Sequence, residues 1–278
     1  IQGAAAAATW PVLMSVLVSA VPQDRMGAAM GVFGASFGLG MSLGPVLGPA
    51  LASVAGIHFP FVLSFLLASA AALAALGLPE TRGGAAERGI GGISDPRLAS
   101  LSLVAFSLLF CMGALVVIFP RYMTDELGLG MGEVALAMAL ASLTYTFLQP
   151  AAGRVADAVD KRVLVVAGLP AAAVSVLLAG NTREACLIYA YMLLFGFAGA
   201  FVFPASNAMV GLIAPPGREG TYTGFYNAML SMGVTVSPIA VGLVADASGY
   251  SLAFATPLLV ASAATMVFAF VFYGGREG

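Results

Sequence analysis

Long apolar runs separated by short polar connectors dominate the residue pattern of this chain. A membrane-spanning helix needs about 20 largely apolar residues, because in hydrocarbon every backbone N–H and C=O must be hydrogen-bonded within the segment. Stretches that meet this requirement lie at approximately 1–20, 27–51, 59–78, 98–120, 131–150, 163–180, 185–212, 221–245 and 251–273. The pattern therefore predicts an all-α integral membrane protein with nine spans.

One connector is longer than the others and divides the chain. Residues 79–97, with the sequence PETRGGAAERGIGGISDPR, are rich in glycine and charge. This segment is too polar for a further span and is typical of a flexible linker. It predicts two helical bundles, one at 1–78 and the other at 98–278.

The basic residues are distributed unevenly between the two sides that alternate connectors define. Arg121 and Arg183 lie on one side. The other side carries Arg25, Arg82, Arg88, Arg97, Arg154, Lys161, Arg162, Arg218 and Arg276. Because short cytoplasmic connectors are enriched in Lys and Arg, we expect this second side to face the cytoplasm. The distribution predicts a multi-pass protein of the cytoplasmic membrane with a cytoplasmic C-terminus.

Composition narrows the functional classes. Only 9% of the residues are charged, whereas soluble domains contain roughly a quarter. The 11 Lys and Arg residues face 13 Asp and Glu residues, so no basic surface for nucleic acid is indicated. A membrane enzyme would need clustered His, Asp or Glu, but the chain has a single His and no metal-ligand spacing. We therefore expect neither an enzyme nor a metal site.

An internal repeat relates the first and last parts of the chain. At an offset of 193, residues 3–71 align with 196–264 without a gap and share 19 identities in 69 positions, three prolines and an arginine among them. The repeat predicts two parallel copies related by an axis along the membrane normal. The spans between 98 and 180 have no partner within the chain. Since 98 minus 193 is −95, about 95 residues with three helices are expected ahead of residue 1.

Three motifs resemble the major facilitator superfamily of secondary transporters. Residues 1–5 (IQGAA) are similar to the end of its fourth-helix signature, and 153–162 (GRVADAVDKR) to its second cytoplasmic loop signature. The pattern G-x8-G-x3-G-P-x2-G at 31–48 is similar to the fifth-helix motif of the drug/proton antiporter branch. The resemblance implies two parallel six-helix lobes, with nine of twelve helices present. Helices 4–6 would lie at 1–78, the inter-lobe linker at 79–97 and helices 7–12 at 98–278.

The fifth-helix motif consists of Gly31, Gly40, Gly44, Pro45 and Gly48. The glycines fall near one stripe and leave a groove in which another helix can approach, and the proline removes one helical hydrogen bond and kinks the span. We interpret the motif as a tight hinge between the lobes. The alternative is ordinary small-residue packing between membrane helices.

The loop motif contains Gly153, Asp157, Lys161 and Arg162. We interpret it as a cytoplasmic latch that pins the ends of neighbouring helices in one conformation and releases them in the other. Ala158 and Asp160 depart from the family pattern, which has a basic residue and a glycine there. In the alternative interpretation the basic residues follow the inside rule and Asp157 caps the next helix.

Polar and aromatic residues that interrupt the apolar spans are candidates for a substrate cavity. They are Tyr145, Gln149, Tyr191, Asn207, Tyr226, Asn227 and Ser231. A large apolar cavity with scattered amides and phenols suits lipophilic, weakly polar compounds. The same residues would also serve as hydrogen-bonding groups between helices or as interfacial anchors.

The sequence favours a secondary active transporter that exports small lipophilic compounds by alternating access and uses the proton gradient instead of a cofactor. No carboxylate lies at mid-membrane depth, and the resemblance implies a proton-carrying group in or beside the segment ahead of residue 1. The expected partners are a small-molecule substrate and the lipid bilayer, with the protein acting as a monomer. The alternatives are a metabolite importer or uniporter on the same fold, and a truncated remnant that does not transport.

Overall fold

A computed structural model describes residues 9, 12–14, 16–77 and 94–274. All elements in these ranges are helical. In chain order they are η1 (Gln23–Arg25), α2 (Met26–Ala55), α3 (Phe59–Ala75), α4 (Pro96–Arg121), η2 (Tyr122–Glu126), α5 (Met131–Ala158), α6 (Lys161–Ala179), α7 (Ala185–Ile213), α8 (Glu219–Ser248) and α9 (Tyr250–Tyr273). The predicted all-α class is confirmed.

Seven of the described helices are long and apolar enough to cross a membrane. They correspond to the spans predicted at 27–51 and from 98 onward. Helix α3 is apolar but has 17 residues, and so is shorter. The span predicted at 1–20 falls largely on residues 1–8, 10–11 and 15, and the linker at 79–97 largely on 78–93, all of which lie outside the described residues.

Local sequence explains where several helices begin and end. Asp95 caps α4, its side chain accepting a hydrogen bond from the Arg97 N–H at 2.8 Å, and Pro96 occupies the first turn. Asp160 caps α6 in the same way, with the Arg162 N–H at 2.9 Å. A short acceptor just before a helix satisfies one of the N–H groups that have no partner inside the helix.

The repeat is visible in the helix boundaries. Helices α2 and α8 each have 30 residues, and both their first and last residues are 193 positions apart. Each helix stops at a glycine with positive φ, Gly56 at 87° and Gly249 at 84°. That backbone conformation is unfavourable for residues with a Cβ. The two copies therefore share their helix-stop signal as well as their apolar pattern.

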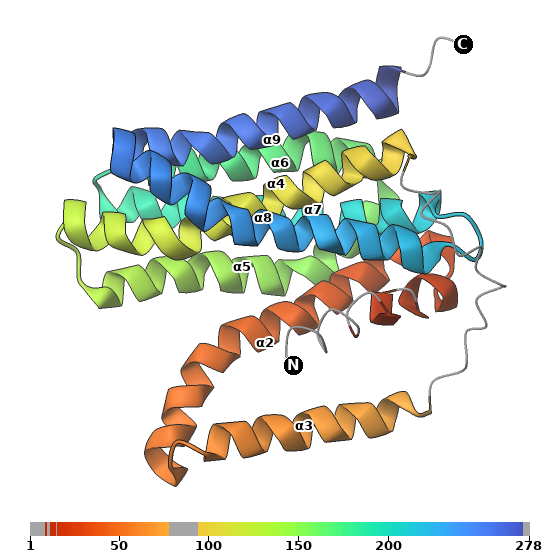
Figure 1. Ribbon diagram of the computed structural model, residues 1–278, viewed down its shortest axis with the longest axis horizontal. Helices are drawn as coiled ribbons and strands as arrows, with labels where there is room; N and C mark the ends of the chain where they lie inside the picture. The colour runs from red at the N-terminus through yellow and green to blue at the C-terminus, as the bar shows by residue number, and fades with distance from the viewer. Residues whose placement is uncertain (1–8, 10–11, 15, 78–93, 275–278) are drawn as a thin grey trace.

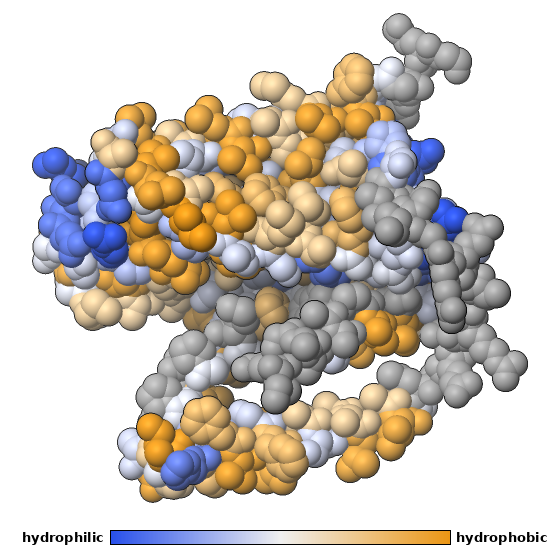
Figure 2. Space-filling view, viewed as in Figure 1, coloured by the Kyte–Doolittle hydropathy of each residue, from blue (hydrophilic) through white to orange (hydrophobic). Residues whose placement is uncertain are grey.

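Helices α4 to α9 form one bundle, with α2 lying along α5 and α3 set apart (Figure 1). The largest buried cluster lies in this bundle, with Leu98, Phe119, Leu169, Tyr226 and Phe268 among its members. In the space-filling view, apolar side chains cover the flank and polar residues gather at the two ends (Figure 2). This distribution is the one expected for a bundle surrounded by hydrocarbon.

We call the end of the bundle at which α2, α4, α6 and α8 begin the basic end. Arg25, Arg97, Arg154, Arg162 and Arg218 lie at or near it. Helices α5, α7 and α9 finish there because neighbouring helices run in opposite directions (Figure 1). The opposite end carries Arg121 and Arg183. The connectors thus alternate as the sequence predicted.

Candidate functional site

Helices α2 and α5 cross in close contact and join the two parts of the chain. A Cβ added to Gly27 would overlap the Gly153 carbonyl oxygen, and one added to Gly153 would overlap that of Gly27. A Cβ on Gly31 would overlap the Gln149 carbonyl. The two backbones therefore touch directly, and only glycine permits this spacing.

The crossing continues along α2 through Gly34 and Gly38. A Cβ on Gly34 would overlap the Gln149 side chain, and a Cβ on Gly38 the Thr146 hydroxyl. The α2 glycines thus follow helical spacings of four, three and four residues and meet α5 positions spaced three and four apart. Two straight stripes of this kind let two helices pack over about three turns.

The residues of the fifth-helix motif do not all lie at the α2–α5 crossing. Gly31 belongs to the crossing, but a Cβ added to Gly40, Gly44 or Gly48 would have no described atom within 4 Å. These three glycines, and Pro45, lie in the second half of α2, which curves away from the bundle (Figure 1). The surface of Pro45 lies outside what the structure describes. Of the groove expected along 31–48, the described residues fill only the part at Gly31. The hinge role of the motif stays a prediction.

Asp157 connects α5 to the first turn of α2. Its carboxylate oxygens accept hydrogen bonds from the Gly27 N–H at 2.6 Å and the Ala28 N–H at 2.7 Å. The residue that precedes α2, Arg25, provides no side-chain cap, so the cap comes from a residue 130 positions away in the sequence. A carboxylate at a helix N-terminus is stabilised by the unpaired N–H groups and by the helix dipole.

The other members of the loop motif have separate positions. Lys161 Nζ lies 3.8 Å from Asp157 Oδ1, and both side chains are largely buried. Arg162 donates a hydrogen bond to the Phe272 carbonyl at 3.0 Å, and its guanidinium group lies over the rings of Phe272 and Tyr273. Asp157 and Lys161 therefore act at the α2–α5 contact, whereas Arg162 anchors the end of α9.

The alternative in which Asp157 caps the next helix is wrong. The N-cap of α6 is Asp160, whose side chain accepts the Arg162 N–H. Asp160 is the residue that departs from the family pattern, in which a glycine stands at this position. The acidic residue that replaces it supplies the local cap, and the Asp157 carboxylate binds the N–H groups of α2 instead.

Two of the cavity candidates, Asn207 and Tyr226, form a buried polar cluster with Ser206 between α7 and α8. The Ser206 and Tyr226 hydroxyls lie 2.8 Å apart. The Asn207 amide donates to the Phe203 carbonyl at 2.8 Å and to the Tyr226 hydroxyl at 3.3 Å. Asn227 donates to the Thr223 carbonyl and to the sulfur of Met14, which precedes α2. Asn227, separately from this cluster, thus joins α8 to the segment that precedes α2.

Three buried side chains nearby keep polar atoms without a hydrogen-bond partner among the described residues. They are Gln149, with both amide atoms, Thr146, with its hydroxyl, and Asn207, with its carbonyl oxygen. Each residue is no more than 1% exposed. An unsatisfied buried polar group costs about 1–3 kcal/mol, and such groups are rare in folded proteins.

The remaining candidates have other surroundings. Tyr145 is half-buried and packs edge-on against Phe203, with ring centroids 6.3 Å apart. Tyr191 is half-buried at the periphery of the apolar core. Ser231 is exposed on α8. The structure thus gathers Gln149, Asn207, Tyr226 and Asn227 on the inner faces of α5, α7 and α8, and sets Tyr191 and Ser231 apart from them.

Sequence reasoning missed Gly27, Gly34, Gly38, Thr146 and Ser206. The glycines carry a detectable signal, because Gly27, Gly31, Gly34 and Gly38 repeat at the spacing of one helix face. Thr146 and Ser206 have no such signal, since hydroxyl residues are common in membrane helices, where they bond back to the preceding turn. Within the described ranges, His, Cys, Asp and Glu side chains form no group of three that is placed to hold a metal ion.

The profile of the family described as the Major Facilitator Superfamily matches residues 1–96 and 101–277. An uncharacterized MFS-type transporter of Methanocaldococcus jannaschii is 26% identical over 152 residues, which are 55% of this chain and 39% of that protein. The quinolone resistance protein NorA of Staphylococcus aureus is 22% identical over 143 residues, which are 51% of this chain and 37% of that protein. The matched segments thus span less than half of each relative.

Two solved structures share the fold. The human organic anion transporter MFSD10 superimposes with a TM-score of 0.79 at 22% identity, covering 93% of this chain and 67% of that chain. A bacterial homologue of the iron transporter ferroportin, in an outward-facing state, gives a TM-score of 0.71 at 16% identity, covering 91% of this chain and 66% of that chain. At these identities the likeness concerns the fold alone.

Proposed function

The chain belongs to the major facilitator superfamily of membrane transporters, and from this premise we propose that it exports small lipophilic organic compounds by alternating access, driven by the proton gradient. The observation that carries the proposal is the α2–α5 contact. Backbones of the two lobes touch through Gly27 and Gly153, and Asp157 closes the contact at the basic end. Alternating access needs such a contact to form on one side of the membrane and to break in the other state.

The basic end faces the cytoplasm in this proposal, because Lys and Arg are concentrated there. The structure then corresponds to a conformation closed toward the cytoplasm. The curvature of α2 away from the bundle on the opposite side supports this assignment (Figure 1).

Opening toward the cytoplasm would separate α2 from α5 and remove the Gly27 and Ala28 N–H groups from Asp157. The carboxylate would then retain Lys161, which already lies 3.8 Å away on the following helix. Asp157 is thus able to exchange two strong backbone hydrogen bonds for water while it keeps Lys161 as a charged partner. An exchange of this kind keeps the free energies of the two states close, as a transport cycle requires.

The substrate class is proposed from the character of the buried polar atoms. Gln149 and Asn207 present uncharged amide groups, and Tyr145 and Phe203 add aromatic surface. Such surroundings suit ligands that combine large apolar area with a few hydrogen-bonding atoms. The relative named for quinolone resistance supports the same class for this chain.

Proton coupling is proposed from the resemblance to the antiporter branch. The acidic residues Glu133 and Asp246 are exposed near the ends of α5 and α8, where water reaches them, so neither is suited to carry a proton across the hydrocarbon. We place the coupling group outside the described residues. A metabolite importer or uniporter on the same fold remains the alternative, and the direction of transport distinguishes it.

The test is transport by the natural gene product, expressed in cells that lack major exporters of their own. We expect lower accumulation of a lipophilic dye, restored by collapse of the proton gradient. Gly153→Val should abolish export, because the added side chain overlaps the α2 backbone. Gly224→Val, at an open position on α8, is the matched control. Unchanged dye accumulation, or export that survives collapse of the gradient, would contradict the proposal.

A further inference from the structure

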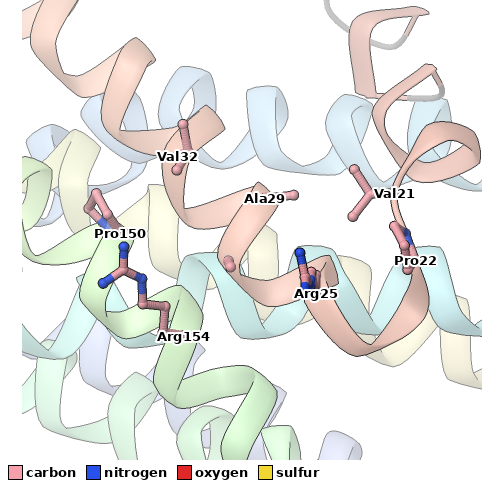
Figure 3. Close-up of a pocket in the computed structure, with 8 residues that line it drawn as sticks. Val21, Pro22, Arg25, Ala29, Val32, Pro150 and Arg154 are labelled. Carbon is pink, nitrogen blue, oxygen red and sulfur yellow. The ribbon is translucent and has the colours of Figure 1, made fainter.

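A pocket of about 390 Å³ lies beside the α2–α5 contact, at the basic end (Figure 3). Its lining comes from the segment that precedes α2, from the first turns of α2 and from the last turns of α5. The residues are Val21, Pro22, Arg25, Ala28, Ala29, Val32, Pro150 and Arg154. Both lobes therefore contribute, and the volume falls within the range of small-molecule sites.

The lining residues lie at different distances from the basic end. At 1.5 Å per residue along the helix axes, Val32 lies about 10 Å further from this end than Arg25, and Pro150 about 6 Å further than Arg154. The deep part is lined by Val32, Ala29 and Pro150. The two arginines come from different lobes, and their backbone positions are the ones nearer the basic end.

No carboxylate of the described residues forms an ion pair with either guanidinium group. Within the described ranges, the ion pairs are Arg121 with Asp125 and Lys161 with Asp157. Arg25 and Arg154 are exposed and pair with no carboxylate of those residues. The nearby Asp157 is already occupied by the α2 N–H groups and Lys161. The pocket thus combines two arginines, which have no ion-pair partner among the described residues, with an otherwise apolar lining.

We propose that this pocket binds an anionic phospholipid of the cytoplasmic leaflet, with the phosphate between Arg25 and Arg154 and the glycerol and first acyl carbons against Val32 and Pro150. Arginine is suited to phosphate because its planar group donates paired hydrogen bonds. Basic pockets between membrane helices on the cytoplasmic side favour anionic headgroups. The assignment depends on the orientation proposed above, but not on the direction of transport or on its substrate.

Occupancy has a conformational consequence. Because one arginine belongs to each lobe, a phosphate that contacts both is bound best while α2 and α5 are together. A ligand that binds one conformation more tightly shifts the population toward it. The bound lipid therefore stabilises the conformation that is closed toward the cytoplasm, and it acts beside Asp157, which stabilises the same contact.

The test measures lipid retention by the natural protein, without any transport assay. The protein is extracted from bilayers with equal amounts of phosphatidylglycerol and phosphatidylcholine, and bound lipids are counted by native mass spectrometry. We expect selective retention of phosphatidylglycerol and roughly 30-fold weaker retention in the Arg25→Gln/Arg154→Gln variant, the size expected for two arginines at an anionic membrane surface.

The matched control is Arg97→Gln/Arg218→Gln, which removes two positive charges from the same end of the bundle, and it should change retention less than threefold. Ala29→Leu keeps both arginines and fills the deep part, so it should weaken retention in a protein whose charge is unchanged. Equal losses in the two double variants, or displacement of the lipid by millimolar inorganic phosphate, would overturn the proposal. The second result would assign the pocket to a free anion.

Discussion

Helices α2 and α3 and helices α8 and α9 are two copies of one sequence repeat, yet among the described residues α3 is exposed where its counterpart α9 is partly buried. Phe61 on α3 is 72% exposed, whereas its repeat partner Phe254 on α9 is fully buried against Phe119 and Tyr122. The described part of α3 buries none of its residues. Helix boundaries thus follow local sequence, but burial depends on which neighbours each copy meets.

Glycines at equivalent positions of the two copies also differ in whether another helix packs on them. Gly233 on α8 packs on the Phe106 backbone of α4, but its partner Gly40 on α2 has no described neighbour within 4 Å. Conversely, Gly31 on α2 packs on α5, and its partner Gly224 on α8 is open. A glycine pattern shared by two helices therefore identifies the faces able to accept a helix, without indicating which face is occupied.

The largest expected difference between the copies comes from the aromatic pair. Phe254→Ala should destabilise the protein by about 3–5 kcal/mol, because it removes a fully buried ring from the core. Phe61→Ala should cost less than about 0.5 kcal/mol, as exposed substitutions do. Thermal unfolding of the two variants in detergent compares them directly. Equal losses would show that α3 is packed against protein in the membrane.

A smaller effect is expected at the lobe contact. Gly31→Val should weaken the closed conformation by about 1–3 kcal/mol through overpacking against Gln149, and Gly224→Val should have little effect. A cysteine in place of the buried Ala152, in a Cys186→Ser background, reports opening through its reaction with a maleimide. Equal reaction rates in both variants would show that the α2 glycines do not control closure.

The smallest effect on opening is expected from substitution of Asp157, which caps α2, compared with Asp160, which caps α6. Asp157→Asn weakens two charge-assisted hydrogen bonds between the lobes and should shift opening by about 1–2 kcal/mol. Asp160→Asn alters a cap within one lobe, where asparagine serves almost as well as aspartate. The same cysteine reporter should react faster only in the first variant. Faster reaction in both would mean that Asp160 also contributes to the lobe contact.

Much of the fold was predictable, because length and apolarity define membrane helices without reference to their neighbours. The boundaries of α2 and α8 follow the 193-residue repeat, and α4 and α6 begin at aspartates visible in the sequence. The α2–α5 crossing was less predictable. Tertiary geometry alone shows that Gly31 acts with Gly27, Gly34 and Gly38, and that Gly40, Gly44 and Gly48 lie on an open stretch.

The sequence indicated which residues belong to the site, but not which partners they contact. Asp157 was expected at the end of a helix, but its partner is the start of a helix 130 residues earlier, and no local pattern specifies such a distant contact. Among the cavity candidates, Asn207 and Tyr226 meet each other and Ser231 faces outward. The polarity of a residue indicates that it needs a partner, whereas the rotation of its helix decides which one it finds.

The amide of Gln149 has a further consequence for the energetics of the lobe contact. While α2 and α5 are together, neither amide atom has a hydrogen-bond partner among the described residues. Separation of the helices would expose both atoms to water and recover about 1–3 kcal/mol of lost hydration. We expect this residue to oppose permanent closure, so that Gln149→Leu slows turnover by making the resting form too stable.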